Sequence, residues 1–236
     1  MTATETADPA AAIAALVPRP SSPIVHEPIL TARLRLLPIS SKHLDGAAFV
    51  KFFAGLYANP AIGSLAGFEP SIITDEKQVS WRANMAGRFE KFGYGTYAVF
   101  ELHDSEYASP IGALDFRSLG AYKSIPDHPK LRRDETEVAY FYDPIAWGKG
   151  YATEALLGVL DDIWIKGVEG RLAEGFPVLE FVSASAVPGH PQSHKILQKC
   201  GLKPVEGTLG FNKDDEVYYR VYRDEWVQGR KQQLQA

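Results

Sequence analysis

The segment from Glu137 to Leu156, EVAYFYDPIAWGKGYATEAL, constrains the fold of this chain more than any other stretch. It begins with strand-like residues, passes through a turn that contains Gly148 and Gly150, and continues with helical spacing. Glycine lets a backbone approach a ligand closely, because no Cβ atom stands in the way. Such a turn and the unpaired N–H groups of the first helical turn form a concave anion site. The pattern therefore predicts a pyrophosphate-binding turn between a strand and a helix.

Two other pyrophosphate motifs do not fit this segment. A P-loop requires GxxxxGK followed by Ser or Thr, whereas Lys149 is followed here by Gly150. The dinucleotide-binding fingerprint GxGxxG belongs early in a βαβ unit, but this segment comes late and has Thr153 at the third glycine position. Two glycines are also compatible with a plain helix entry, so the rest of the chain has to decide between these interpretations.

Hydrophobic periodicity predicts the order of the other elements. We expect strands over residues 30–37, 94–102, 110–116, 135–142 and 179–187, and a closing hairpin over 207–223 that turns at 213–215. We expect helices from Ser40 or Ser41 to Leu56, from Thr74 to Lys91 with Gly93 ending it, over 150–166 and over 191–200. Residues 119–133 and 167–177 form long connections. Three consecutive strands followed by a βαβ-like passage indicate a mixed sheet with helices on its faces.

Composition excludes several classes of protein. The 236 residues include 25 basic and 29 acidic side chains, so the chain lacks the surplus of Lys and Arg that a general nucleic-acid binder needs. The single cysteine, Cys200, excludes an internal disulfide and a cysteine-built zinc site. No apolar run is long enough to cross a bilayer, and we expect a flexible Ala- and Pro-rich tail over residues 1–28. That tail has neither a secretory nor a mitochondrial pattern, which favours a cytoplasmic or nuclear protein.

Three segments together decide the interpretation: TARLRLLP at residues 31–38, the segment 137–156, and SHKILQKCGL at residues 193–202. In this order and spacing they resemble the GNAT acetyltransferase superfamily, and within it the ribosomal-protein N-acetyltransferases of the RimJ/RimL type. The resemblance implies an α/β (α+β mixed) fold, in which a splayed mixed sheet of about seven strands is flanked by helices. It also implies a single domain over residues 29–236.

The resemblance further implies the activity. An acetyl-CoA-dependent N-acetyltransferase of this kind moves an acetyl group to a primary amine by direct transfer in a ternary complex. The amine is a protein or peptide N-terminus, an amino acid or another small amine, and the sequence leaves these alternatives open. The competing hypothesis is a non-catalytic acyl-CoA-binding protein with a degenerate site. Neither hypothesis involves nucleic acid or a membrane, and the chain is expected to be a monomer or a homodimer.

By this resemblance, acetyl-CoA binds in the V between the strand that starts the segment and the next strand of the sheet. Its pantetheine arm pairs with the backbone of Tyr140–Tyr142 as an added strand, and its pyrophosphate lies on N–H groups between Trp147 and Thr153. Trp147 replaces the usual Gln or Arg of the family, and His190 replaces a common Asn. The residues implied for the cofactor are Tyr140, Phe141, Tyr142, Trp147, Gly148, Lys149, Gly150, Tyr151, Ala152, Thr153, His190 and Ser193.

Glu137 is the candidate general base, because members of the family often have a carboxylate facing the cleft here. Strand alternation places Glu137 on one face with Glu135 and Phe141. Apolar and aromatic neighbours are expected to raise the pKa of Glu137, which suits a base that takes the amine proton. An ion pair between Glu137 and an Arg or Lys is the alternative, and Glu135 and Asp115 are other candidate bases.

Other roles follow from the same resemblance. Backbone N–H groups at about Tyr140 and Phe141 would polarise the thioester carbonyl. Leu197 stands where many members have a Tyr, so protonation of the departing thiolate falls to Ser193 or to water. Trp81 and Arg82 would border the acceptor side.

The lone cysteine and a pair of histidines could indicate further chemistry, but simpler interpretations are expected for both. Cys200, at a helix end, is expected to be a buried structural thiol rather than a ping-pong nucleophile. His190 and His194 are four residues apart, but the nearby sequence offers no third ligand, so no metal is expected.

Overall fold

The computed structural model describes residues 27–41, 44–62, 74–102, 109–118, 130–131, 135–166, 175–176, 178–206 and 216–235. Most of the tail expected over 1–28 and most of the two long connections lie outside the described residues, as does the expected hairpin turn at 213–215.

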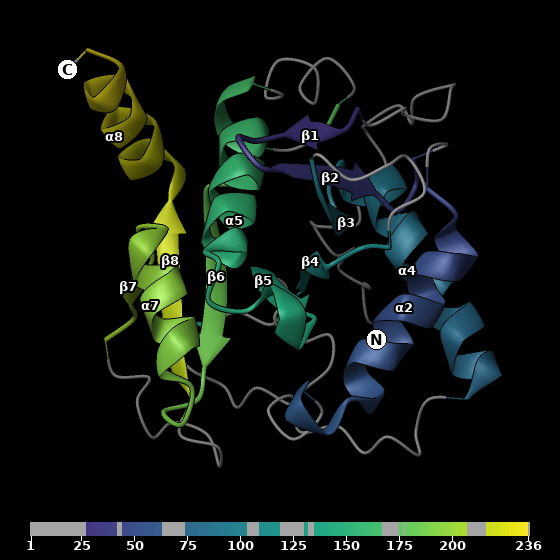
Figure 1. The fold of residues 1–236 in the computed structure, drawn as a ribbon. Coiled ribbons are helices and arrows are strands. Elements are labelled where there is room, and N and C mark those ends of the chain that lie inside the picture. The colour runs from purple at the N-terminus through teal and green to yellow at the C-terminus, as the bar shows by residue number, and fades with distance from the viewer. Residues whose placement is uncertain are drawn as a thin grey trace, which may run out of the picture.

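The described strands form one mixed sheet of eight strands in the order β1-β2-β3-β4-β5-β6-β8-β7, which confirms the predicted class with one strand more than expected (Figure 1). Neighbouring strands are antiparallel except β5 and β6, which are parallel. The strands are β1 (Ile29–Leu30), β2 (Leu34–Pro38), β3 (Thr96–Glu101), β4 (Gly112–Ser118), β5 (Thr136–Tyr142), β6 (Phe181–Ala186), β7 (Lys203–Pro204) and β8 (Val217–Tyr222).

One strand prediction was wrong in detail. The expected continuous strand over 30–37 is interrupted at Thr31, whose N–H donates to the carbonyl of Leu34 at 2.9 Å, so that the chain turns between β1 and β2. In the later part of the chain, β8 lies within the expected hairpin and pairs with β7, a strand before residue 207 that was not predicted, while the expected first arm of the hairpin lies outside the described residues.

The helices are α2 (Gly46–Ala58), α4 (Asp75–Phe92), α5 (Tyr151–Asp161), α7 (Pro191–Lys199) and α8 (Arg223–Gln235). A short 3-10 turn, η2 (Pro144–Ala146), precedes α5, and the π-helical η3 (Asp162–Lys166) continues it. Among the described helices, none is both long and apolar enough to span a membrane.

Helix ends follow from local side-chain hydrogen bonds. The hydroxyl of Thr74 accepts from the N–H of Lys77, and Gly93 ends α4 with a φ of 71°, so both expected ends of this helix are confirmed. The expected cap at Ser40 or Ser41 was wrong, because the carboxylate of Asp45 accepts from the N–H groups at the start of α2. Helix α8 was not expected, since the buried side chain of Trp226 is not part of a long apolar stripe.

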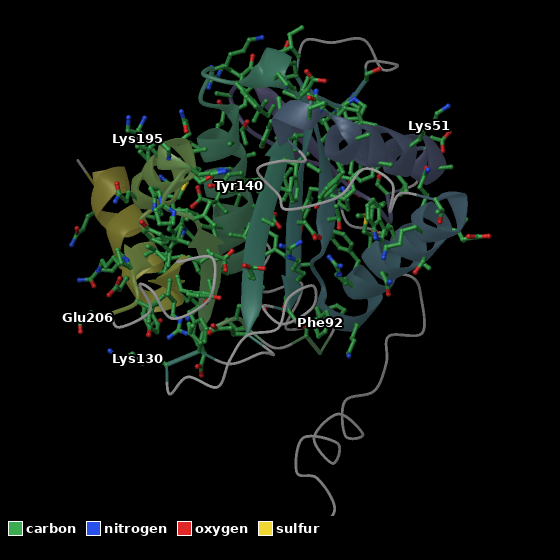
Figure 2. The ribbon with its side chains drawn as sticks, turned by 90° about the horizontal axis from the view of Figure 1, so that it is seen from below. Lys51, Phe92, Lys130, Tyr140, Lys195 and Glu206 are labelled. Atoms are coloured by element: carbon green, nitrogen blue, oxygen red, sulfur yellow. The ribbon has the colours of Figure 1, made fainter. Side chains whose placement is uncertain are left out.

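Helices cover both faces of the sheet near β5. Phe141 packs against Phe53 of α2, with ring centroids 5.6 Å apart. On the opposite face, the hydroxyl of Tyr140 donates to the carbonyl of Ser193 on α7. Tyr140 is labelled in Figure 2 among the side chains of the central strands. Consecutive residues of β5 thus face different helical layers, as strand alternation requires.

The parallel strands β5 and β6 pair at one position only among the described residues, which include both strands in full. Glu137 lies opposite Ser183 there, near the beginning of each strand. Toward their carboxyl ends the two strands are no longer paired, whereas β5 remains paired with β4 as far as Tyr142. The sheet is therefore splayed between β5 and β6.

Close packing behind β5 depends on Gly112 of β4. A Cβ atom at this position would lie 2.7 Å from Cε1 of Tyr142 and 2.8 Å from the carbonyl oxygen of Phe141. The ring of Tyr142 thus covers the glycine, and both residues are buried.

Replacing Gly112 with Ala should lower the free energy of unfolding by about 1–3 kcal/mol, because the ring of Tyr142 would have to move. Gly55→Ala in α2 is the matched control, since a Cβ there meets no described atom within 4 Å and alanine favours a helix by about 1 kcal/mol. Urea unfolding measures both variants. Equal stability of the two would contradict the close approach of Tyr142 to β4.

Candidate functional site

The open edge of β5 is the first component of the site. Tyr140 and Tyr142 pair with β4 on one side, opposite Leu114 and Gly112, and have no partner residue on β6 among the described strands. An extended ligand can add to such an edge as a strand. One group is already engaged, since the indole N–H of Trp147 donates to the carbonyl of Tyr142 at 2.8 Å.

The glycine turn follows directly after η2. Gly148 and Gly150 have φ angles of 75° and 80°, in the left-handed region that residues other than glycine rarely adopt. A Cβ at Gly148 meets no described atom within 4 Å, so the turn is open there. Gly150 caps α5 without a side-chain hydrogen bond, which leaves the first N–H groups of the helix to a ligand. Tyr151, Ala152 and Thr153 form this first turn of α5.

Charged side chains surround the turn. The guanidinium of Arg33 donates to the carbonyl of Lys149 at 3.0 Å and forms an ion pair of 2.7 Å with Glu154. Burial alone would raise the pKa of Glu154, but hydrogen bonds from Thr31 and Arg33 outweigh it and hold that pKa below its usual value. The ammonium of Lys149 lies 3.6 Å from the carboxylate of Glu101. Arg33 and Glu154 were not among the predicted site residues.

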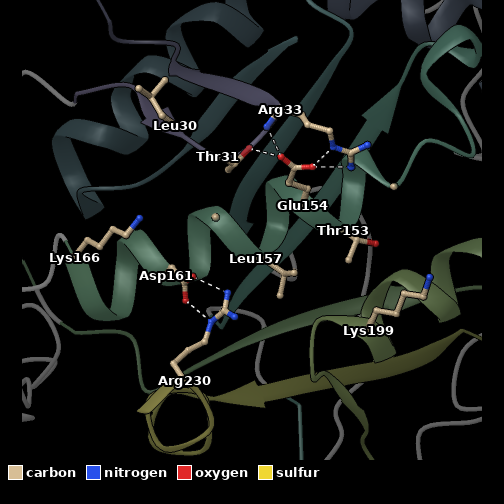
Figure 3. A pocket seen from close by; sticks show the side chains of 12 residues that line it. Leu30, Thr31, Arg33, Thr153, Glu154, Leu157, Asp161, Lys166, Lys199 and Arg230 are labelled. Carbon is tan, nitrogen blue, oxygen red and sulfur yellow. Dashed lines mark hydrogen bonds and ion pairs between the residues drawn. The ribbon is translucent and has the colours of Figure 1, made fainter. Parts of the chain in front are cut away.

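A cavity of about 460 Å³ begins beside this turn and runs along the outer face of α5 (Figure 3). Its walls come from β1 and the segment after it, α5, η3, the last residue of α7 and the middle of α8. The residues that line it are Leu30, Thr31, Arg33, Gly150, Thr153, Glu154, Leu157, Gly158, Asp161, Lys166, Lys199 and Arg230.

Glu137 lies where β5 and β6 separate, and it is 2% exposed. Its two carboxylate oxygens accept from Arg117 of β4 at 3.1 Å and from the hydroxyl of Ser185 of β6 at 3.0 Å. The expected environment of apolar and aromatic neighbours was therefore wrong, and the alternative of an ion pair with an Arg or Lys is the one that the structure shows. Arg117 lies directly opposite Glu137 in the sheet, a register that a long connection hides from the sequence.

A second carboxylate extends this network on the same face. Asp115 accepts from the guanidinium of Arg88 on α4 and from the hydroxyl of Thr96 at 2.7 Å. Arg117 lies between the two carboxylates, 3.9 Å from Asp115. Burial alone would lower the pKa of Arg117, but Glu137 and Asp115 outweigh it and raise that pKa. The buried charges of this face are thus paired across three elements.

Aromatic side chains adjoin this network. Trp81 of α4 is 7% exposed and packs against Phe53 and Tyr57, with ring centroids 5.9 and 5.5 Å apart. Tyr57 in turn lies 4.8 Å from the ring of Phe141 on β5. Trp81 therefore belongs to the wall behind Phe141. The other predicted acceptor residue, Arg82, lies in α4, but its side chain is outside the described part of the structure.

The start of α7 faces the other side of β5. His190 caps this helix without a side-chain hydrogen bond, and Ser193 accepts from Tyr140 through its backbone carbonyl. Burial raises the pKa of Tyr140 above its usual value, so its hydroxyl remains protonated. Leu197 is buried.

His194 links three elements behind this helix. Its Nε2 lies 3.0 Å from the carbonyl of Val187, and its Nδ1 lies 2.7 Å from the hydroxyl of Tyr219 on β8. A carbonyl only accepts, so Nε2 carries a proton and donates to Val187. Within the described residues, no group of three or more His, Cys, Asp or Glu side chains is arranged to hold a metal.

Cys200 joins α7 to α5. Its thiol is buried and donates to the carbonyl of Thr153 at 3.7 Å. Burial raises the pKa of this thiol to about 12. The structure therefore places Cys200 in the core, as expected of a structural thiol.

The chain is similar to known proteins both in sequence pattern and in fold. The sequence model of the acetyltransferase (GNAT) domain matches residues 33–203. No curated protein matches the chain.

Three similar solved structures illustrate the likeness in fold. An acetyltransferase from Agrobacterium tumefaciens str. C58 has a TM-score of 0.56 and 17% identity, over 87% of this chain and 99% of that chain. RimL, a ribosomal α-N-protein acetyltransferase in complex with coenzyme A, has a TM-score of 0.55 and 14% identity, over 83% of this chain and 98% of that chain. Spermidine N-acetyltransferase from Vibrio cholerae, in complex with coenzyme A and spermine, has values of 0.55 and 14%, over 84% and 99%. At these identities the likeness shows the fold alone.

The raised pKa of Cys200 predicts that the native protein resists alkylation by iodoacetamide at pH 8. With a pKa of about 12, only about one thiol in ten thousand is ionised at that pH, and the thiolate is the reactive form. Mass spectrometry should find one modified thiol per chain in denaturant and almost none without it. Rapid alkylation of the folded protein would instead show an accessible thiol that could act as a nucleophile.

Proposed function

Because the chain belongs to the acetyltransferase (GNAT) domain family, we propose that it is an acetyl-CoA-dependent N-acetyltransferase acting on a primary amine. The observation that carries this proposal is the continuity of three features along β5. Glu137 lies where the strands separate, the open edge at Tyr140–Tyr142 follows, and the turn at Gly148 and Gly150 comes next.

The donor groups on this path fit acetyl-CoA, which supplies the acetyl group as a thioester. The open edge of β5 offers backbone groups to an amide-containing arm, although the carbonyl of Tyr142 is already bonded to Trp147. The glycine turn and the uncapped first turn of α5 suit a pyrophosphate. We assign the pyrophosphate to the turn residues Trp147 to Thr153. We assign the rest of the cofactor to Tyr140, Phe141, Tyr142, His190 and Ser193.

Glu137 has the position of the proton acceptor. A substrate amine has a pKa of about 8 to 10 and must lose a proton before it can attack, directly or through a water. Arg117 and Ser185 each donate a hydrogen bond to this carboxylate and so fix its orientation. The N–H groups near Tyr140 and Phe141 would polarise the thioester carbonyl. Leu197 has no exchangeable proton, so Ser193 or water would protonate the thiolate.

The acceptor approaches, in this proposal, from the face that α2 and α4 cover. Glu137 and Phe141 lie on that face, with Trp81 behind them. The described carboxylates Asp115 and Glu137 are each paired with a guanidinium there. These balanced charges favour an acceptor with one amine, such as a peptide N-terminus or an amino acid, over a polyamine. Burial of Cys200 supports direct transfer rather than a thiol intermediate.

Calorimetric titration with acetyl-CoA, followed by a thiol-release assay over peptides, amino acids and polyamines, tests the activity and its acceptor. Micromolar binding and release with one amine class would support the proposal. Binding without release on any of them would favour the non-catalytic acyl-CoA-binding alternative. No binding would contradict the assignment of the glycine turn.

Glu137→Gln should lower kcat about a hundredfold and leave the Kd for acetyl-CoA unchanged, because the amide accepts hydrogen bonds but takes no proton. Glu135→Gln is the matched control. Glu135 is also buried beside β5 and is paired with an arginine, Arg220, at 2.6 Å. Steady-state thiol release measures both variants. Loss of turnover in Glu135→Gln alone would move the base to Glu135.

Gly150→Val should weaken acetyl-CoA binding at least about tenfold, because a β-branched residue disfavours the positive φ that aims the turn. Gly201→Val is the control, since Gly201 has a φ of 77° at the end of α7 and open space around it. Both variants should lose stability, but only Gly150→Val should lose affinity in calorimetry. Retained affinity in both would remove the turn from the cofactor site.

A further inference from the structure

Two arginines from opposite ends of the chain bind the same helix. Glu154 and Asp161 lie seven residues apart on α5, on the face that lines the cavity (Figure 3). Arg33, from the segment between β1 and β2, pairs with Glu154 at 2.7 Å. Arg230 of α8 donates to both oxygens of Asp161, at 2.8 and 2.6 Å. The two ion pairs are chemically alike, but only the first lies beside the glycine turn.

The contacts of Arg33 continue into that turn. Its guanidinium donates to the carbonyl of Lys149 at 3.0 Å and lies 4.8 Å from the centre of the Tyr151 ring. Its own backbone N–H donates to Glu154 at 2.8 Å, and the hydroxyl of Thr31 donates to the same oxygen at 2.6 Å. One short segment therefore fixes both the middle of the turn and the first turn of α5.

The turn needs such support because of its own composition. Glycine loses more conformational freedom on folding than any other residue type, and the turn contains two, Gly148 and Gly150. A Cβ atom at Gly148 would also meet no described neighbour. A flexible turn binds a ligand less tightly than one already ordered. The charge of Glu154 matters as well, since an unpaired carboxylate in the first helical turn would repel a bound anion. The guanidinium of Arg33 neutralises it there.

We propose that Arg33 is a positioning residue for the phosphate-binding turn, acting through Glu154 and the carbonyl of Lys149. This inference rests on the proposed function, because it assumes that the turn binds the pyrophosphate of acetyl-CoA. Arg33 is 49% exposed at its side chain, so the expected effect is moderate.

The test compares Arg33→Met with Arg230→Met, which removes the matched ion pair two turns further along α5. Arg33→Met should raise KM for acetyl-CoA and the calorimetric Kd for coenzyme A about fivefold, with kcat unchanged. Arg230→Met should lower the thermal midpoint without changing either constant. Arg33→Lys should recover part of the affinity, since an ammonium still neutralises Glu154 but cannot reproduce the fork of donors.

A substrate without phosphate separates positioning from general damage. S-acetylpantetheine carries the thioester arm but no pyrophosphate, so its kcat/KM should be the same in wild type and Arg33→Met. Equal losses on both substrates, or an equal loss of affinity in Arg230→Met, would overturn the role of Arg33. Wild-type affinity for coenzyme A in Arg33→Met would overturn it while leaving the proposed function intact. A wild-type protein that binds no coenzyme A would overturn both.

Discussion

The single pairing between β5 and β6 is the constraint on which the rest of the structure depends. Parallel neighbours normally bond evenly along their length, but these two strands pair only where Glu137 faces Ser183. The hydrogen bond from Ser185 to Glu137 reinforces that point with side chains. Beyond it, β5 is paired on one side only, and its open edge leads into the glycine turn. Glu137, the proposed base, therefore also connects the two halves of the sheet.

The buried charges around Glu137 have a structural consequence of their own. Glu137, Arg117, Asp115 and Arg88 come from β4, β5 and α4, so the network fixes the helix relative to the sheet. Buried ion pairs often add little stability, because desolvation offsets much of the attraction between the charges. Removing one partner is costly, since it leaves the other charge buried and unpaired. The network thus specifies one arrangement of the acceptor face more than it stabilises the fold.

Sequence patterns predicted those parts of the structure that depend on neighbouring residues. Thr74 and Gly93 define the ends of α4 through contacts within one helical turn. Gly148 and Gly150 indicate a turn with positive φ angles, because glycine adopts them readily. Arg117 was not predicted as the partner of Glu137, because their register is set across a connection with no pattern of its own. Arg33 lay inside a predicted motif, but its partner is 121 residues away.

Predictions for single residues also depend on contacts that only the folded chain provides. The cap of α2 went to Asp45 because three residues near the helix start had suitable side chains, and only the fold selects one. Trp147 differs in type from the family residue, yet its indole supplies a donor that reaches the carbonyl of Tyr142.

The ion pairs of α5 also bear on the order in which the helix gains its contacts during synthesis. Arg33 precedes Glu154 by 121 residues, whereas Arg230 follows Asp161 by 69. During synthesis Arg33 is therefore already available when α5 is made, whereas the contact between Asp161 and Arg230 has to wait for a further 69 residues.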